Sequence, residues 1–347
     1  MAHVSENAVI KDADLYSFWN PMGSHAMMIK EIGGAGQSSY NDLARRYGTI
    51  FNTTDWLKIF EDTTQLYGIY DKGDNLIGGF YLYKEKRSIF TIYRDPPFTP
   101  AIGPFLEVKA ENPVAIMDLW KKTVASIAGF IEELPYSVIS VSLNKNIIDA
   151  QPFIWSKFKV IPRYTYILEL GKSMEDIRKE MSNARRNDMN KAIKDGLAVR
   201  LVNDLNLVKS LVLKTYSRQE MAANEYYLDK VLFEFANKDN SFGFVTVRDG
   251  NPIAASFCVY DKDTAYYLLG GYDHKSKHHG AGALAIWEAI KYAKDLGLKH
   301  FDFEGSMVPE IERYFRGFGG QLTPLYRVNK AKLPLEILLK FFKRDLF

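Results

Sequence analysis

The chain has 347 residues, a formal net charge of +3, 47% hydrophobic residues and 25% charged residues. These values are typical of a globular protein with one large domain or two, and so small a charge excess does not indicate nucleic-acid binding. Cys258 is the only cysteine, which excludes an intrachain disulfide and fits a reducing cytoplasm. No apolar stretch reaches the roughly 18 residues of a membrane-spanning helix.

The first 27 residues differ from the remainder of the chain. Residues 23–27 are GSHAM, a run that resembles the scar of a cleaved tag, and Met28 fits a natural start. The segment also lacks the apolar core of a signal peptide. We therefore interpret residues 1–27 as a tag or vector-derived segment.

Residues 28–160 are predicted to form an N-terminal lobe. Four prolines break the region 95–104 into a loop, and a long amphipathic helix is expected over 113–132. Short runs rich in β-formers predict strands over 29–32, 66–70, 76–83, 89–93 and 137–143. This mixture of strands and helices is typical of an α/β lobe.

A C-terminal lobe is predicted over 161–330. A strand over 163–170 leads into a charged helix over 174–195, which Ser173 caps and Gly196 ends. Strands are expected near 198–202, 242–248 and 252–260, and helices near 205–220 and 227–235. The segment 331–347 is expected to form a basic amphipathic C-terminal helix.

The stretch 265–320 has the order strand, glycine loop, helix, strand. An aromatic run at 266–269 has strand character, and residues 301–304 alternate as a half-buried strand does. Between them, residues 277–282 are KHHGAG, of the form K-x-x-G-x-G, and apolar residues recur at helical spacing from Ala283 to Ala293. Free amides at a helix start attract phosphate groups, and glycines allow a close approach. The alternative is a tight turn with a solvated basic loop.

Other phosphate and metal motifs are not supported. The dinucleotide fingerprint G-x-G-x-x-G and the P-loop are both absent from the sequence. His274, His278 and His279 lie on one loop with no cysteine nearby, which is not the spacing of a zinc site. We predict no bound metal.

The K-x-x-G-x-G loop resembles the Q/R-x-x-G-x-G/A loop with which GNAT-superfamily acyltransferases hold the pyrophosphate of coenzyme A. Lysine at the first position keeps the charge. The resemblance implies an acyl-CoA co-substrate whose pantetheine arm lies between splayed strands at 265–270 and 300–304. The residues expected to bind it are Lys277, His279, Gly280, Ala281, Gly282, Ala283, Leu269 and Gly270.

A wider resemblance covers nearly the whole chain after Met28. Residues 51–56, 164–170, 173–196 and 301–320 are similar to the corresponding regions of FemAB-type proteins. The resemblance implies two GNAT-like lobes in tandem, an α/β fold with mixed sheets flanked by helices. FemAB proteins transfer an aminoacyl group from tRNA to a peptidoglycan-precursor amine, so aminoacyl-tRNA is the alternative donor. It also implies that Trp56, Arg185 and Arg186 contribute to substrate binding.

Amine acylation needs alignment of the donor, a deprotonated amine and stabilisation of the oxyanion. Asp302 and Glu304 project from one face of their strand, where either carboxylate could accept the amine proton. The alternative is that they pair with neighbouring basic groups. Many GNAT enzymes place a tyrosine acid in Y-x-x-x-G-F; here Phe315 is at the matching position, so Tyr314, one place earlier, is the candidate and Tyr326 a second possibility.

The expected function is therefore transfer of an acyl group from a CoA thioester to a small-molecule amine. The guanidinium groups of Arg185 and Arg186 suit an acceptor with an anionic group. A catalytically degenerate GNAT-like binding protein is the alternative from another class. We expect a cytoplasmic protein, and residues 331–347 could add peripheral contact with the inner face of the membrane or dock on the protein itself or a dimer partner.

Overall fold

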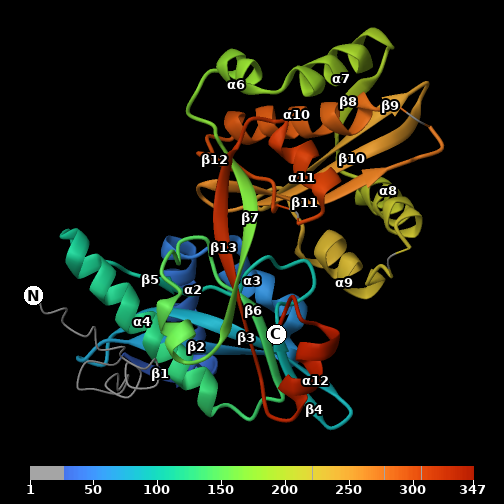
Figure 1. Ribbon diagram of the computed structural model, residues 1–347. Helices are drawn as coiled ribbons and strands as arrows, with labels where there is room; N and C mark the ends of the chain where they lie inside the picture. The colour runs from blue at the N-terminus through green and yellow to red at the C-terminus, as the bar shows by residue number, and fades with distance from the viewer. Residues whose placement is uncertain (1–26, 221, 277, 306) are drawn as a thin grey trace, which may run out of the picture.

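The computed structural model describes residues 27–220, 222–276, 278–305 and 307–347. Two lobes lie one above the other, joined by two long strands (Figure 1). Within the described residues, no helix is long and apolar enough to cross a membrane. The predicted tag, apart from Met27, and the predicted donor-loop residue Lys277 lie outside the described residues.

A single 13-stranded mixed sheet runs through both lobes, in the order β1-β2-β3-β4-β6-β13-β7-β12-β11-β10-β9-β8, with β5 paired to β3. The first lobe contributes β1 (Met28–Glu31), β2 (Thr64–Tyr70), β3 (Leu76–Arg87), β4 (Phe90–Arg94), β5 (Phe105–Leu106) and β6 (Val138–Ser142). The second contributes β8 (Ala198–Val202), β9 (Ser241–Arg248), β10 (Asn251–Tyr260), β11 (Thr264–Tyr272) and β12 (His300–Asp302).

The strands β7 (Lys159–Glu169) and β13 (Gln321–Ala331) connect the lobes. They pair antiparallel from Gln321↔Ile167 to Asn329↔Lys159. The far end of β13 also pairs with β6 of the first lobe, while β7 pairs with β12 of the second. The C-terminal strand therefore returns to the first lobe, and one continuous sheet stands where the sequence predicts a sheet in each lobe. The boundary predicted at 160/161 falls inside β7 and stays a prediction.

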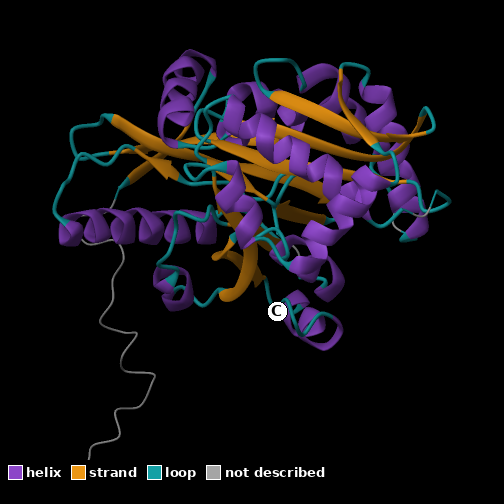
Figure 2. Cartoon of the chain, turned by 90° about the horizontal axis from the view of Figure 1, so that it is seen from above, coloured by secondary structure: helices purple, strands orange, loops and turns teal. Residues whose placement is uncertain are grey.

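Helices cover both faces of the sheet (Figure 2). The first lobe carries α2 (Gln37–Tyr47), α3 (Thr54–Leu57), α4 (Pro113–Glu133) and α5 (Gln151–Trp155). One apolar core extends from these helices to α8 (Leu205–Arg218) and α9 (Glu225–Asp229), on one face of the second lobe. A second core lies on the opposite face, beneath α10 (Gly280–Asp295) and α11 (Pro309–Arg316). Successive side chains along β9 to β11 point to opposite faces of the sheet, so these buried strands contribute to both cores.

The single helix predicted over 174–195 is wrong. The segment forms α6 (Met174–Glu180) and α7 (Asn183–Lys194), separated at Met181 and Ser182. Ser182 has extended backbone angles, and its hydroxyl accepts a hydrogen bond from the amide of Arg185, which starts a new helix. The cap at Ser173 and the stop at Gly196, whose φ is +78°, are confirmed.

The C-terminal segment is only partly helical. β13 continues to Ala331, and the helix α12 spans Leu335–Phe342, less than the predicted 331–347. No side chain of α12 is buried, and its phenylalanines Phe341 and Phe342 are exposed. This helix therefore contributes little to the core of its own lobe.

Candidate functional site

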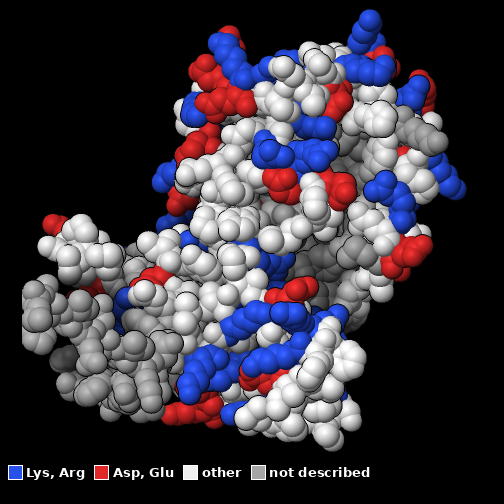
Figure 3. Space-filling view, in the orientation of Figure 1, with Lys and Arg blue, Asp and Glu red and all other residues white. Residues whose placement is uncertain are grey.

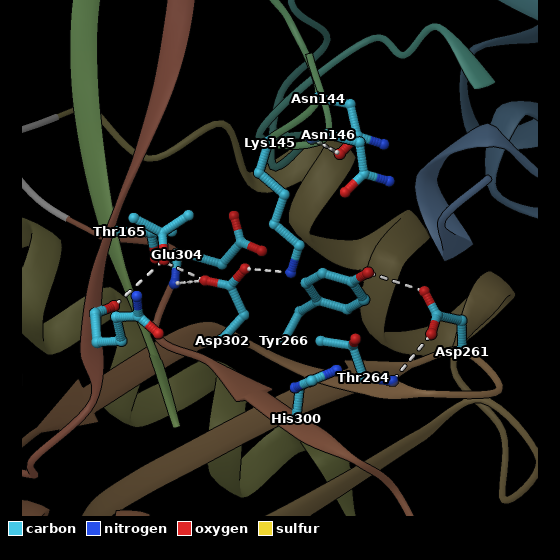
Figure 4. A network of polar contacts seen from close by, with 12 residues as sticks. Asn144, Lys145, Asn146, Thr165, Asp261, Thr264, Tyr266, His300, Asp302 and Glu304 are labelled. Carbon is cyan, nitrogen blue, oxygen red and sulfur yellow. Dashed lines mark hydrogen bonds and ion pairs between the residues drawn. The ribbon is translucent and has the colours of Figure 1, made fainter. Parts of the chain in front are cut away.

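The strands β11 and β12, which the resemblance to GNAT enzymes implies should separate, are paired over a short stretch only. They pair in parallel from Thr264↔His300 to Tyr266↔Asp302. β12 ends there, while β11 continues to Tyr272. Polar side chains from both lobes gather where the strands separate (Figure 4).

Asp302 is held at the end of β12 by donors from three elements. The hydroxyl of Thr165, on β7, donates to Oδ1 at 2.5 Å, and the amide of Glu304 donates to the same oxygen at 3.0 Å. Nζ of Lys145, in the loop after β6, lies 3.2 Å from Oδ2. The carboxylate is buried, so its position and its charge partner are both fixed.

The strand predicted to include Glu304 ends at Asp302, so the prediction that Asp302 and Glu304 share one strand face is wrong, and Glu304 occupies a tight turn directly after β12. Its φ is +58°, uncommon for a residue with a side chain, and Gly305 comes next with φ of +63°. Only glycine fits at 305, because a Cβ there would stand 2.0 Å from the carbonyl oxygen of Tyr164. Strained backbone of this kind is often found where a side chain must be aimed at a ligand.

The environment of Glu304 favours the protonated carboxyl. Burial raises its pKa well above the usual range, the charge of Asp302 raises the pKa further, and Lys145 partly opposes both effects. Glu304 and Asp302 thus share one site but differ in surroundings, since Asp302 has the direct ion pair. A pair of this type suits proton transfer, with one carboxylate fixed and the other able to take up a proton.

A cleft of about 700 Å³ opens beside these carboxylates. The first lobe lines it with the proline-rich loop 95–101 and with Lys145, and the second lobe with Thr165, Tyr266 and Glu304. Because both lobes and the connecting strands contribute, neither lobe alone contains this cleft. Its size fits a small-molecule ligand.

Tyr266 and Trp56 hold the walls of the cleft. The Tyr266 hydroxyl donates to Oδ2 of Asp261 at 2.8 Å, and its ring packs edge-on against Phe51 of the first lobe. Trp56, predicted to bind substrate, is 0% exposed, and its indole N–H donates to Oγ1 of Thr99 at 3.0 Å. Thr99 lines the cleft, so Trp56 supports the wall from behind.

The head of α10, predicted to bind the donor diphosphate, is covered by the chain itself. Gly280 lies against α7, because a Cβ added there would stand 2.0 Å from the carbonyl oxygen of Asp188. The amide of Gly280 donates to Nδ1 of His278 at 3.2 Å, and the amide of Ala281 donates to the His278 carbonyl oxygen at 3.1 Å. Buried His278 also places Nε2 3.1 Å from Oδ2 of Asp195. Two of the expected diphosphate donors therefore already have acceptors.

The other residues predicted to bind the donor lie on either side of this head. His279 is exposed, whereas Gly282 and Ala283 lie in the first turn of α10, where Ala283 is buried. Leu269 and Gly270 lie in β11 and pair with β10. Their roles in donor binding, like that of Lys277, stay predictions.

Arg185 and Tyr314 come together at Gly282. The Arg185 guanidinium carbon lies 4.3 Å from the centre of the Tyr314 ring, and Nη2 lies 2.8 Å from Oδ2 of Asp188. A Cβ at Gly282 would stand 3.1 Å from the Tyr314 hydroxyl. Burial raises the pKa of the Tyr314 phenol. Neither Tyr314 nor Arg185 is among the described residues that line the cleft.

Arg186 is engaged at the junction of α6 and α7. Its Nη1 donates to the carbonyl oxygens of Lys179 at 2.7 Å and Met181 at 2.8 Å. These are free carbonyl groups at the end of α6, which a guanidinium satisfies well. The contacts give Arg186 a structural part, and its predicted binding of the acceptor stays a prediction.

Sequence reasoning missed Lys145, Thr165 and Arg163, which the fold brings to the cleft. One signal was present for two of them, because Arg163 and Thr165 lie two apart in a predicted strand and so share a face. Lys145 gave no such signal, since it reaches Asp302 across 157 residues of sequence. Among the described residues, no group of three or more His, Cys, Asp or Glu side chains is placed to hold a metal.

Comparisons place the fold among known proteins. Residues 175–316 match the family model of the acetyltransferase (GNAT) domain. FemX has a similar structure, with a TM-score of 0.66 and 13% identity over 90% of this chain and all of that one.

Two further structures match with lower scores. The C-terminal domain of a putative lysylphosphatidylglycerol synthetase from Agrobacterium fabrum gives a TM-score of 0.54 and 10% identity, over 88% of this chain and 95% of that one. L-PGS from Bacillus licheniformis gives a TM-score of 0.51 and 12% identity, over 91% of this chain and 98% of that one. No curated protein matches the chain in sequence. At identities this low, the structural similarity shows a shared fold and nothing more.

Proposed function

We propose that this chain, whose residues 175–316 match the GNAT domain and whose fold is similar to that of FemX, transfers an acyl group to an amine in the cleft beside Glu304. The observation that carries this proposal is the Glu304 carboxyl, whose pKa burial raises, standing where β11 and β12 part. When it is ionised, a carboxylate with a raised pKa is a stronger base than an exposed one, and so is a suitable acceptor for the proton that an attacking amine must lose.

The reaction proceeds in one displacement. The amine nitrogen attacks the acyl carbonyl carbon and forms a C–N bond, while its proton passes to Glu304. The C–S bond of a thioester, or the C–O bond of an ester, then breaks. The thiolate or alkoxide leaves and takes up a proton, which Glu304 can return.

The edge of β11 supplies a place for the oxyanion. Beyond Tyr266, no described strand pairs with β11 on the side that β12 has left. Amides on this free edge can donate to the acyl carbonyl oxygen as negative charge develops there. Leu268, in this stretch, lines the cleft, and Leu269 and Gly270 come directly after it.

Two donors are compatible with this chemistry. Acyl-CoA is the donor that the glycine loop predicts. Aminoacyl-tRNA is the second candidate, favoured by one observation: the amides of Gly280 and Ala281 are already occupied by His278. A donor that carries its ester without a diphosphate at this helix does not need those amides. The name of one similar structure, the domain from Agrobacterium fabrum described as part of a putative lysylphosphatidylglycerol synthetase, agrees with transfer of an aminoacyl group.

The test is single-turnover transfer from acetyl-CoA and from charged tRNAs to a panel of primary amines. With whichever donor reacts, Glu304→Gln should lower the transfer rate about 100-fold or more. Donor affinity, measured by thermal shift, should not change. Glu169→Gln, an exposed carboxylate that pairs with His300, is the matched control.

Two outcomes would contradict the proposal. An unchanged rate in Glu304→Gln removes this residue as the base. Donor binding without transfer to any amine would favour a ligand-binding protein instead.

A further inference from the structure

Arg163 is a cationic side chain without a partner in the cleft. It lies on β7 opposite Leu325 of β13, is half-buried and lines the cleft. Among the described residues, no carboxylate pairs with its guanidinium and no acceptor receives its hydrogen bonds. A half-buried guanidinium normally has such partners, because desolvation of an unpaired charge is costly.

The charged residues near Arg163 leave this part of the cleft with an excess of positive charge. Arg327 lies 2.7 Å from Oδ2 of Asp95, and its Nε lies 3.3 Å from the Ser142 hydroxyl. Asp95 is therefore occupied by Arg327, and two guanidinium groups face one carboxylate. Burial lowers the pKa of Arg163, the charge of Arg327 lowers it further, and the charge of Asp95 partly opposes both effects. An anion bound beside the two arginines would stabilise the charged form of both guanidinium groups.

The position of Arg163 relates it to the proposed base. Arg163 and Thr165 lie two residues apart on β7 and share a face, about 7 Å apart along the strand. Thr165 is the residue that donates to Asp302. An anionic group at Arg163 and an amine at Glu304 can thus belong to one molecule, provided that several bonds separate them.

We infer that Arg163 binds an oxyanion of the acceptor, a phosphate or a carboxylate, while the amine of the same molecule reaches Glu304. The inference rests on the proposed function, whose acceptor it narrows to an amine with a remote anionic group. In this scheme Arg163, and not Arg185, binds the anionic group, because Arg185 already forms an ion pair with Asp188. Arg163 is a binding residue in this scheme and takes no part in proton transfer.

The first experiment measures anion binding without turnover. Inorganic phosphate and succinate are titrated separately against wild-type protein, Arg163→Gln and the control Arg185→Gln, with the melting temperature as readout. One of the two anions should stabilise wild type and Arg185→Gln but not Arg163→Gln. Which anion acts separates a phosphate from a carboxylate. Equal stabilisation of Arg163→Gln, or none of the wild type by either anion, would overturn the inference.

The second experiment uses transfer kinetics. Arg163→Gln should raise the KM for an anionic amine about tenfold or more and leave kcat nearly unchanged. An uncharged amine of similar length should show no such change. Glu304→Gln should keep anion binding and lose turnover, so failure of the base and failure of the anion site give different results. A KM unaffected by Arg163→Gln would contradict the inference.

A separate observation concerns the end of the sheet where the chain finishes. Ser137 hydrogen-bonds with Thr91 and with the amide of Lys332, so the β3–β4 turn and the start of the α12 segment lie side by side. Both expose apolar side chains. The most exposed are Ile89 at 84% and Phe341 at 82%, and the rest are Phe90, Leu333, Ile337, Leu338 and Phe342.

Basic residues surround these apolar side chains. Lys and Arg side chains gather beside the apolar C-terminal segment (Figure 3). Residues Arg87, Lys332, Lys340, Lys343 and Arg344 belong to the two exposed elements. We propose that this surface, the 89–90 turn with residues 333–342, docks on an anionic lipid bilayer, because apolar insertion with flanking positive charge fits such a surface.

Vesicle sedimentation tests the docking surface. Wild-type protein should sediment with vesicles containing phosphatidylglycerol and much less with pure phosphatidylcholine, and binding should fall with salt. Phe341→Glu should abolish binding, whereas Val114→Glu, at an exposed position on α4, should not. Equal sedimentation of wild type and Phe341→Glu would overturn the proposal. So would a dimer in solution that Phe341→Glu dissociates, since a second copy would then cover this surface.

Discussion

The two ends of the β11–α10–β12 unit differ in what they leave open to a ligand. At the end of β12, Asp302 and Glu304 border a cleft of about 700 Å³ lined by both lobes. At the head of α10, His278 accepts from the first amides, and Gly280 is packed against α7. Both regions contain the residue types of an acyltransferase site, and among the described residues the carboxylates border a cleft whereas the first amides of α10 already have acceptors.

The difference between the two regions lies in which hydrogen-bonding groups are left for a ligand. Free amides at a helix start bind anions only while nothing else receives their hydrogen bonds. Here the loop's own histidine receives them. The carboxylates, in contrast, lie where two parallel strands diverge, and a diverging pair leaves one strand edge without a partner.

Among variants that keep Glu304, Asp302→Asn should have the largest effect. The change keeps the shape of the side chain but leaves the Lys145 ammonium without its closest counter-charge. We expect the transfer rate to fall about 100-fold. The free energy of unfolding should fall by about 3 kcal/mol, as measured by urea denaturation, because a charge whose partner is removed stays desolvated. Wild-type stability in this variant would show that the ion pair does not organise the cleft.

Gly280→Ala tests the covered head of α10. The added Cβ would stand 2.0 Å from the Asp188 carbonyl oxygen, a backbone atom that cannot turn away. We expect a loss of about 2–3 kcal/mol in the free energy of unfolding. Gly282→Ala is the matched control, because its Cβ would meet only the Tyr314 hydroxyl at 3.1 Å. Equal stability of the two variants would mean that α7 does not close this helix end.

The pH dependence of transfer should identify Glu304 as the base. Only the ionised carboxylate accepts a proton, so the rate should rise with pH through its raised pKa and fall about tenfold per pH unit below it. Asp302→Asn should move this rising part of the pH–rate profile to lower pH, because the Asp302 charge raises the Glu304 pKa. Glu304→Gln should lose this pH dependence and retain only the one caused by deprotonation of the acceptor amine. A rise at the same pH in all three proteins would contradict the assignment.

Tyr314→Phe should have the smallest effect. Tyr314 lies at Gly282 and beneath Arg185, outside the lining of the cleft. We expect the initial rate of transfer to fall less than about threefold. A loss near that of Glu304→Gln would show instead that Tyr314 acts as the predicted acid, and that the donor reaches the head of α10.

Much of the local structure could be predicted because its causes are local. The aromatic run at 266–269, the glycine loop and the one-sided helix from Ala283 to Ala293 each depend on neighbouring residues, and they predicted the order strand, loop, helix, strand. The separation of the two strands was expected only from the resemblance to GNAT enzymes, and its position at Asp302 was not predicted. The break at Ser182 was missed because a serine within a charged segment can lie inside a helix or cap a new one. The sequence pattern alone did not distinguish the two. Glu304 was chosen as a candidate base from its strand face; its turn and its raised pKa were not predictable.

The sequence by itself determined the order of elements, the resemblance to GNAT and FemAB proteins and the two carboxylates at the end of one strand. Only the tertiary structure decided which of these groups meet in a cavity. Lys145 approaches Asp302 from the first lobe, Arg327 pairs with Asp95 near Arg163, and α7 packs against Gly280 at the start of the glycine helix. Each of these facts depends on contacts between residues far apart in the chain, and such contacts leave no periodicity in the sequence.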